Sequence, residues 1–305
     1  MDYITKDEII IFAPKFNAQL DTDLLINYKK IIFSNFDLCD ELFDAYSNNN
    51  NLQNLNCSEF GFSGGLFNLP VNLIPQTITH LIFGYYFNNQ VNLLPSNLIH
   101  LSFGPVFNFP VNLLPQTITY LSFGWEFNHS INLLPPNIIH LSFGFKFNQP
   151  LNLSPTTLTH LTFGESFNQP LNLLPTTLTH LTFGWNFNQQ CDLASSVKYL
   201  KLNCNNNYLI NNLPDSVEEL ILGDNFNSEL NDLPNGVKKI IFHKYSDYNK
   251  EFNSLPNFLE YLVLPRYYRK KILNIPPKLK KIVCSKKYEF IDDFTNINTD
   301  VEFYS

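Results

Sequence analysis

A unit of twenty residues repeats along most of this chain, and it limits the fold more than any other feature. The dipeptide Phe-Asn returns every twenty residues from Phe67 to Phe187, and a glycine does so from Gly64 to Gly184. Past residue 190 the copies continue with small changes of spacing. A unit this short cannot bury its own apolar side, so successive copies must stack on one another and share a core.

Each unit contains one short strand and an apolar segment that carries proline. Apolar and polar residues alternate in 159–163, which is typical of a strand with Leu161 and Phe163 in the core and His160 facing away from it. Gly164 follows, and we expect a glycine there because it adopts a positive φ and lets the chain turn. Proline discourages a helix in the second half, where we expect extended backbone. The strand core occurs eleven times, which predicts a mainly β solenoid of about eleven coils of 20 residues.

Asparagine follows the same period, and we interpret its main column as a structural ladder. A stacked coil leaves backbone groups in its turns that no sheet hydrogen bond satisfies, and an amide side chain can both donate and accept. The predicted ladder consists of Asn68, Asn88, Asn108, Asn128, Asn148, Asn168, Asn188, Asn207 and Asn227.

The charge distribution argues against most enzyme classes. Between residues 61 and 190 the only charged side chains are Glu126, Lys146 and Glu165. Acid–base pairs and carboxylate metal sites need several such groups close together. Five cysteines, without a CxxC pair, favour a reducing compartment over a zinc site or a disulfide framework. We therefore predict a protein without catalysis, metal or cofactor.

The termini carry no targeting signal that the sequence reveals. Residues 1–8 contain acids where a signal peptide has bases, and no apolar run approaches the roughly 18 residues of a membrane helix. We expect a protein of the cytoplasm that does not bind a membrane.

The repeated motifs resemble a known family. FNLP at 67–70, FNFP at 107–110 and FNQP at 147–150 and 167–170, within LPTTLTHLTFG-type units, are similar to the FNIP repeat of social amoebae and giant amoebal viruses. That family is related to leucine-rich repeats, so the resemblance implies a leucine-rich-repeat-like solenoid and, in a virus, the host cell cytoplasm. It also implies a protein-protein interaction scaffold whose protein partner the sequence does not identify.

The two ends differ from the repeat region at 60–288. Residues 1–59 show no copy of the unit, and Thr5-x-x-Glu8 before an apolar run resembles a capping box, so we expect a small helical N-terminal cap. Some FNIP proteins resemble F-box proteins there, which leaves a degenerate F-box-like module and a ubiquitin-ligase adaptor as an alternative. The acidic segment 289–305 is expected to be a C-terminal cap or tail.

Two surfaces are candidates for protein contacts. One is the polar stripe that the strands direct away from the core, and it is a neutral stack, a pH-sensitive face or a metal site. The other is the variable pair of residues after each glycine, where exposed aromatic side chains suit an interface. The candidates are His80, His100, Tyr120, His140, His160, His180 and Tyr199 on the stripe, and Tyr85, Tyr86, Trp125 and Trp185 after the glycines.

The last coils are basic. From Lys238 to Lys287 there are 13 lysines or arginines against three acids, although the whole chain has a net charge of -7. The densest run mixes cations with aromatics, as single-strand binders do. The run is either a solubilising end or a patch for nucleic acid or another polyanion, made of Arg266, Arg269, Lys270 and Lys271.

Overall fold

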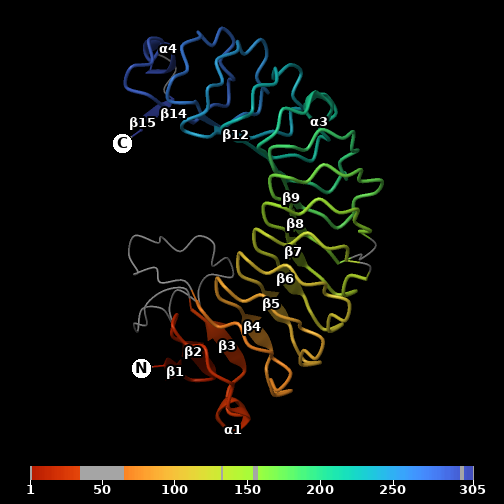
Figure 1. Ribbon diagram of the computed structural model, residues 1–305. Coiled ribbons are helices and arrows are strands. Elements are labelled where there is room, and N and C mark those ends of the chain that lie inside the picture. Colours follow the sequence, from red (N-terminus) through yellow and green to blue (C-terminus); the bar gives the residue numbers. More distant parts are fainter. Residues whose placement is uncertain (1, 35–64, 132, 154–156, 296–298, 305) are drawn as a thin grey trace. The chain divides into compact units, whose positions relative to one another are not determined.

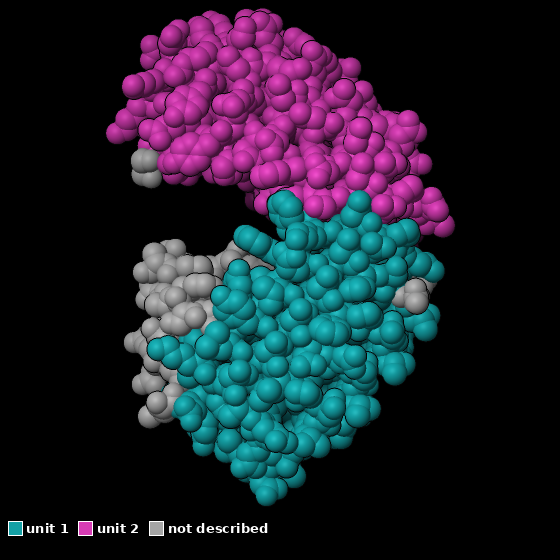
Figure 2. All heavy atoms as spheres, in the orientation of Figure 1, with its two compact units in different colours: residues 1–155 teal, residues 156–305 magenta. Residues whose placement is uncertain are grey.

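The computed structural model describes residues 2–34, 65–131, 133–153, 157–295 and 299–304. The chain forms two units, residues 1–155 and 156–305, which Figure 2 shows in different colours. In each unit short strands lie side by side, and each strand belongs to one coil of the chain (Figure 1). No helix within these ranges is long and apolar enough to cross a membrane.

The sheet of unit 1 follows the order of the sequence. Its first two strands are antiparallel, and the pairs that follow are parallel with equivalent residues side by side, as His80 with His100. A single turn of helix, α1 (Thr22–Leu25), is capped by Asp21. The strands are β1 (Tyr3–Lys6), β2 (Ile9–Phe12), β3 (Lys30–Phe33), β4 (His80–Ile82), β5 (His100–Ser102), β6 (Tyr120–Ser122) and β7 (His140–Ser142).

Unit 2 continues the same pattern with an all-parallel sheet in sequence order. Two short helices, α3 (Asn207–Asn211) and α4 (Asp292–Thr295), interrupt otherwise irregular connections. The strands are β8 (His160–Thr162), β9 (His180–Phe183), β10 (Tyr199–Leu202), β11 (Glu219–Leu222), β12 (Lys239–Phe242), β13 (Tyr261–Val263), β14 (Lys281–Cys284) and β15 (Asp300–Phe303).

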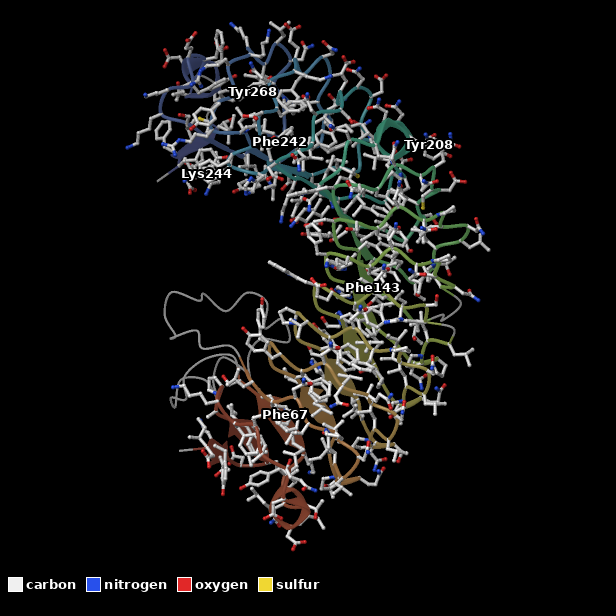
Figure 3. All side chains as sticks on the ribbon, in the orientation of Figure 1. Phe67, Phe143, Tyr208, Phe242, Lys244 and Tyr268 are labelled. Atoms are coloured by element: carbon white, nitrogen blue, oxygen red, sulfur yellow. The ribbon has the colours of Figure 1, made fainter. Side chains whose placement is uncertain are left out.

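Columns of stacked phenylalanines fill the core of both units. Each full repeat contributes two rings, such as Phe103 and Phe107, whose centroids lie 3.9 Å apart. Each ring also stacks on its equivalent in the next coil, 5.4 Å away for Phe103 and Phe123. Phe67 and Phe143 mark this core in Figure 3. The predicted mainly β, leucine-rich-repeat-like solenoid is confirmed.

The regular spacing of glycine has a different cause from the one expected. The glycines at the strand ends do not need a positive φ; the close approach of neighbouring coils excludes a side chain. A Cβ on Gly104 would lie 2.0 Å from the carbonyl oxygen of Gly84, and one on Gly124 would lie 2.1 Å from that of Gly104. The repeat therefore requires glycine for space between coils.

In the described part of residues 1–59 the predicted helical cap is limited to the single turn α1, and three strands form beside it. Strands β1 and β2 occupy the segment read as a capped helix, joined by a two-residue turn in which Asp7 has a φ of 52°. Aspartate tolerates this left-handed conformation, and a short apolar run such as 9–12 fits a buried strand as well as a helix. Residues 35–64, with much of the F-box-like alternative, lie outside the described residues.

The repeat in fact begins near the N-terminus. Phe12 stacks on Phe33 at 5.3 Å, and Phe16 stacks on Phe67 at 6.0 Å, so these rings open the two phenylalanine columns. Phe16-Asn17 follows Phe12 with the spacing of the repeat, and this was the signal that the sequence reading missed.

The C-terminal segment also adds to the sheet. Strand β15 pairs in parallel with β14, and Val301 lies beside Ile282. The acidic segment 289–305 therefore contains α4 and then a further strand of the solenoid.

Candidate functional site

The polar stripe forms a stack of rings on the sheet of each unit. In unit 1 the centroid distances are 5.6 Å from His80 to His100, 4.1 Å from His100 to Tyr120 and 5.6 Å from Tyr120 to His140. In unit 2, His160 and His180 lie 4.0 Å apart, and Tyr199 stacks on His180 at 5.3 Å. The parallel register brings the predicted residues of each unit together, because it places equivalent residues side by side.

Burial lowers the pKa of His80, His100 and His180 and so favours their neutral form. It lowers the pKa of His100 to about 3, with His80, Lys30 and His140 adding repulsion, and it lowers the pKa of His80 to about 4, with repulsion from Lys30. The pKa of His180 is also lowered by burial. The Nδ1 atoms of His80 and His180 lie 2.9 Å from the hydroxyls of Thr79 and Thr179. In the described chain no three His, Cys, Asp or Glu side chains are placed to hold a metal ion.

Acidification is expected to destabilise unit 1 through His100. The pKa of this buried ring lies below 6.5, its value in an unfolded chain, so the unfolded state takes up the proton first. The stability that neutral His100 contributes is present above pH 6.5 and is lost progressively down to about pH 3. At pH 5 this loss is about 2 kcal/mol.

Chemical unfolding at pH 7.5 and pH 5 measures this loss. His100→Tyr, which repeats the residue found at position 120, should lose about 2 kcal/mol less than the wild type between the two pH values. His243→Tyr, on an exposed residue, is the control. An equal pH dependence in His100→Tyr and the wild type would show that His100 is not the titrating group.

A row of exposed aromatic side chains follows the strand ends of unit 1. The exposed fractions are 47% for Tyr86, 64% for Trp125 and 43% for Phe145, and we call these three residues the aromatic edge. The rings of Trp125 and Phe145 lie 6.5 Å apart. Tyr85 packs against Tyr86 at 4.8 Å and is half-buried. In unit 2, Trp185 occupies the position in its coil that Trp125 has in unit 1, and it is 46% exposed.

Backbone hydrogen bonds between coils hold this edge in register. The N–H of Glu126 donates to the carbonyl of Pro105 over 2.9 Å, and the N–H of Lys146 donates to that of Trp125 over 2.8 Å. Glu126 and Lys146 form an ion pair of 2.6 Å beside the rings. The aromatic edge therefore lies on a fixed backbone, with its neighbouring charges paired.

The asparagine column forms hydrogen bonds from coil to coil. The side-chain oxygen of Asn68 accepts from the backbone N–H of Asn88 over 2.8 Å. The side chains of Asn88, Asn108 and Asn128 each accept from the equivalent N–H of the next coil in the same way. In unit 2, Asn168 accepts from the N–H of Asn188.

The ladder differs from the prediction at its ends. Asn207 does not belong to it, because it begins α3, and Asn205 accepts from the N–H of Asn227 instead. The side-chain oxygen of Asn17 accepts from the backbone N–H of Asn68, and that of Asn249 accepts from the N–H of Arg269. The sequence prediction does not include Asn17 and Asn249, because their coils depart from the repeat.

The sequence prediction does not include a row of exposed leucines in unit 1. The unit contains adjacent apolar residues before its proline, and in extended backbone only one of the two faces the core. The exposed fraction is 56% for Leu73, 64% for Leu93, 71% for Leu113 and 77% for Leu133. The Leu-Leu pair in the sequence was the available signal.

The predicted polyanion patch is divided among different partners. Lys270 lies 3.7 Å from Glu251, and Lys271 lies 3.2 Å from Asp293. Arg269 donates from its guanidinium to the carbonyl of Tyr268. Arg266 lies at the strand end after β13, so neighbours in the sequence do not form one cluster here.

Comparisons with known proteins agree with this architecture. A family model described as "FNIP Repeat" matches overlapping segments that together span residues 68–267. The crystal structure of CroV588, a circular leucine-rich-repeat protein from the giant virus CroV, is similar to this chain with a TM-score of 0.65 and 28% identity. The match covers 99% of this chain and 54% of CroV588, so the chain spans about half of that protein's length.

Two bacterial structures are more distant. YopM from Yersinia enterocolitica matches with a TM-score of 0.36 and 18% identity over 77% of this chain and 63% of its own. The functional domain of InlJ from Listeria monocytogenes matches with a TM-score of 0.42 and 11% identity over 72% of this chain and 60% of its own. A search of curated proteins finds no match.

Proposed function

We propose that this chain, which belongs to the FNIP repeat family, is a non-catalytic scaffold that binds another protein through the aromatic edge of unit 1. The solenoid fold supports this proposal, because such folds present extended surfaces on which partners bind. The observation that carries it is the exposure of Tyr86, Trp125 and Phe145 on a backbone fixed by hydrogen bonds between coils.

The chemistry of the edge indicates the kind of partner. Trp and Tyr dominate the energetics of protein interfaces, and rigid placement lowers the entropy lost on binding. The nearby charges of Glu126 and Lys146 already form an ion pair. The partner should therefore offer an apolar or uncharged surface, and binding should depend little on salt.

The test compares affinity capture by the wild type with capture by Trp125→Ser/Phe145→Ser. We expect a direct partner to be retained by the wild type and to bind the double variant at least about 10-fold more weakly, because two exposed aromatic anchors are lost. The interaction is then measured by calorimetry with both proteins purified.

The matched control is Leu113→Ser/Leu133→Ser, which removes two apolar side chains of the same unit that are more exposed than Trp125 and Phe145. This variant should keep the partner. A partner that tolerates the aromatic substitutions, or that is lost equally with the leucine substitutions, would contradict the assignment of the aromatic edge.

A further inference from the structure

Three successive coils of unit 2 each carry a pair of residues after their strand, Lys-Tyr and Arg-Tyr in the first two and Lys-Lys in the third. Each pair lies within four residues of the end of β12, β13 or β14. The backbone N–H of Arg266 donates to the carbonyl of Lys244 over 2.9 Å, which joins the first two of these turns. We call the row the basic edge, and it consists of Lys244, Tyr245, Arg266, Tyr267, Lys286 and Lys287.

The sheet register brings these residues together from distant parts of the sequence. Lys239 pairs with Tyr261, and Tyr261 pairs with Lys281, so the three strands end side by side. Neighbouring strands lie about 4.8 Å apart, which places the first and third turns on the order of 10 Å from each other. The four cations thus follow one edge of the sheet over three successive coils.

The charge of the basic edge is less neutralised than that of the neighbouring sheet face. On the strands and just before them, lysines alternate with glutamates from coil to coil: Lys238 lies 2.8 Å from Glu218, and Lys280 lies 2.8 Å from Glu260. Among the described residues, no carboxylate lies within ion-pair distance of the exposed Arg266, Lys286 or Lys287. These three cations leave the edge with a net positive charge that attracts an anion.

The two tyrosines of the edge present their rings to solvent. Tyr245 is 55% exposed and Tyr267 is 54% exposed. The Nζ of Lys244, marked in Figure 3, lies 5.7 Å from the ring of Tyr245 and 5.3 Å from that of Tyr304. Cations beside exposed aromatic faces are the combination that binds a phosphate backbone and stacks its unpaired bases.

We propose that the basic edge is a binding site for single-stranded nucleic acid. The exposed tyrosines favour this ligand over an acidic peptide, which offers no bases to stack. A duplex is disfavoured because its bases are already stacked and the strand ends provide no helix to enter a groove. The site lies in unit 2 and is independent of the protein-binding role proposed for the aromatic edge of unit 1.

The arrangement also predicts how binding should respond to salt. Each phosphate neutralised on a single strand contributes about -0.7 to the slope of log K against log salt, so four cations give a slope of up to about -3. Affinity should therefore be modest and should fall steeply as salt is raised.

The experiment uses the full chain and a fluorescein-labelled oligouridylate of about 12 nucleotides, with binding followed by anisotropy at increasing salt. Lys244→Ser/Arg266→Ser/Lys286→Ser/Lys287→Ser should weaken binding at least about 10-fold and flatten the salt slope. Tyr245→Leu/Tyr267→Leu should weaken binding at least about 5-fold through lost stacking. The tyrosine variant should leave the affinity for an abasic strand of the same length unchanged.

The matched control removes four cations from the sheet face and the adjacent turns. Lys198→Ser/Lys238→Ser/Lys239→Ser/Lys280→Ser changes the net charge by the same amount, and all four residues have a glutamate partner. It should bind as the wild type does, and circular dichroism verifies that each variant is folded.

Three results would overturn the proposal. The first is no binding by the wild type at about 50 mM salt. The second is an equal loss in both four-residue variants, which would indicate net charge rather than a site. The third is evidence of a general polyanion surface. Either an unchanged affinity of the tyrosine variant for oligouridylate, or a wild type that binds polyglutamate as tightly as oligouridylate, would provide it.

Discussion

Replacing Phe127 with alanine is expected to lower the free energy of unfolding by about 4 kcal/mol. The ring is fully buried and stacks on Phe123 at 3.9 Å within its coil. It also stacks on Phe107 and Phe147, at 6.1 Å each, in the coils on either side. The substitution therefore leaves a cavity in a column whose neighbouring rings are fixed by their own stacking, so the column cannot collapse to fill it.

Guanidinium unfolding followed by circular dichroism measures the effect. Because each coil contacts mainly its neighbours, hydrogen exchange should also increase in the coils of Phe107 and Phe147. Phe145→Ala is the control, since that ring is 43% exposed and should cost less than about 1 kcal/mol. Equal destabilisation by the two substitutions would contradict the importance of the phenylalanine column.

Replacing Gly124 with alanine is expected to cost about 3 kcal/mol. The added Cβ would lie 2.1 Å from the carbonyl oxygen of Gly104 and 2.7 Å from the Cα of Pro105. Both atoms belong to the backbone of the neighbouring coil, so no side-chain rotation relieves the contact. The coils must separate locally, which weakens the phenylalanine stacking next to them.

The control for this substitution occupies the equivalent position of a later coil. His243 follows β12 as Gly124 follows the strand core of its own coil, and it already carries an exposed side chain. His243→Ala should therefore change the unfolding free energy by less than about 0.5 kcal/mol. If Gly124→Ala were equally mild, the closeness of the coils would not explain the repeated glycine.

The period of the sequence was sufficient to predict the architecture. Alternation around Leu161 and Phe163 indicated which side chains are buried, and the twenty-residue spacing indicated which of them stack. The same alternation placed His80, His100 and Tyr120 in one stripe. These predictions succeed because the same residue types return at the same positions in many units, so the pattern is not due to chance.

The errors arose where the repeat is irregular or where local signals are ambiguous. Residues 9–12 are apolar at every position, which does not distinguish a strand from a buried helix, and the turn at Asp7 was read as a capping box. Spacing alone assigns Asn207 to the ladder. In the structure Asn206 caps α3, and Asn205 provides the ladder hydrogen bond to Asn227.

The candidate sites depend more strongly on the tertiary structure. The dense run from Arg266 to Lys271 suggested one patch, but Lys270 and Lys271 pair with Glu251 and Asp293. The basic edge instead joins residues 244, 266 and 286, which only the register of β12, β13 and β14 brings side by side. Which cations keep a counter-charge is decided by contacts between coils.

The sequence by itself determined the repeat, the strand in each unit and the solenoid, because a twenty-residue unit has only stacking as a way to bury its Leu and Phe side chains. The tertiary structure alone decided why the glycine is needed, which leucine of each pair is exposed and which lysines are paired. Those properties depend on how the coils pack and on the register between them, which no single unit determines.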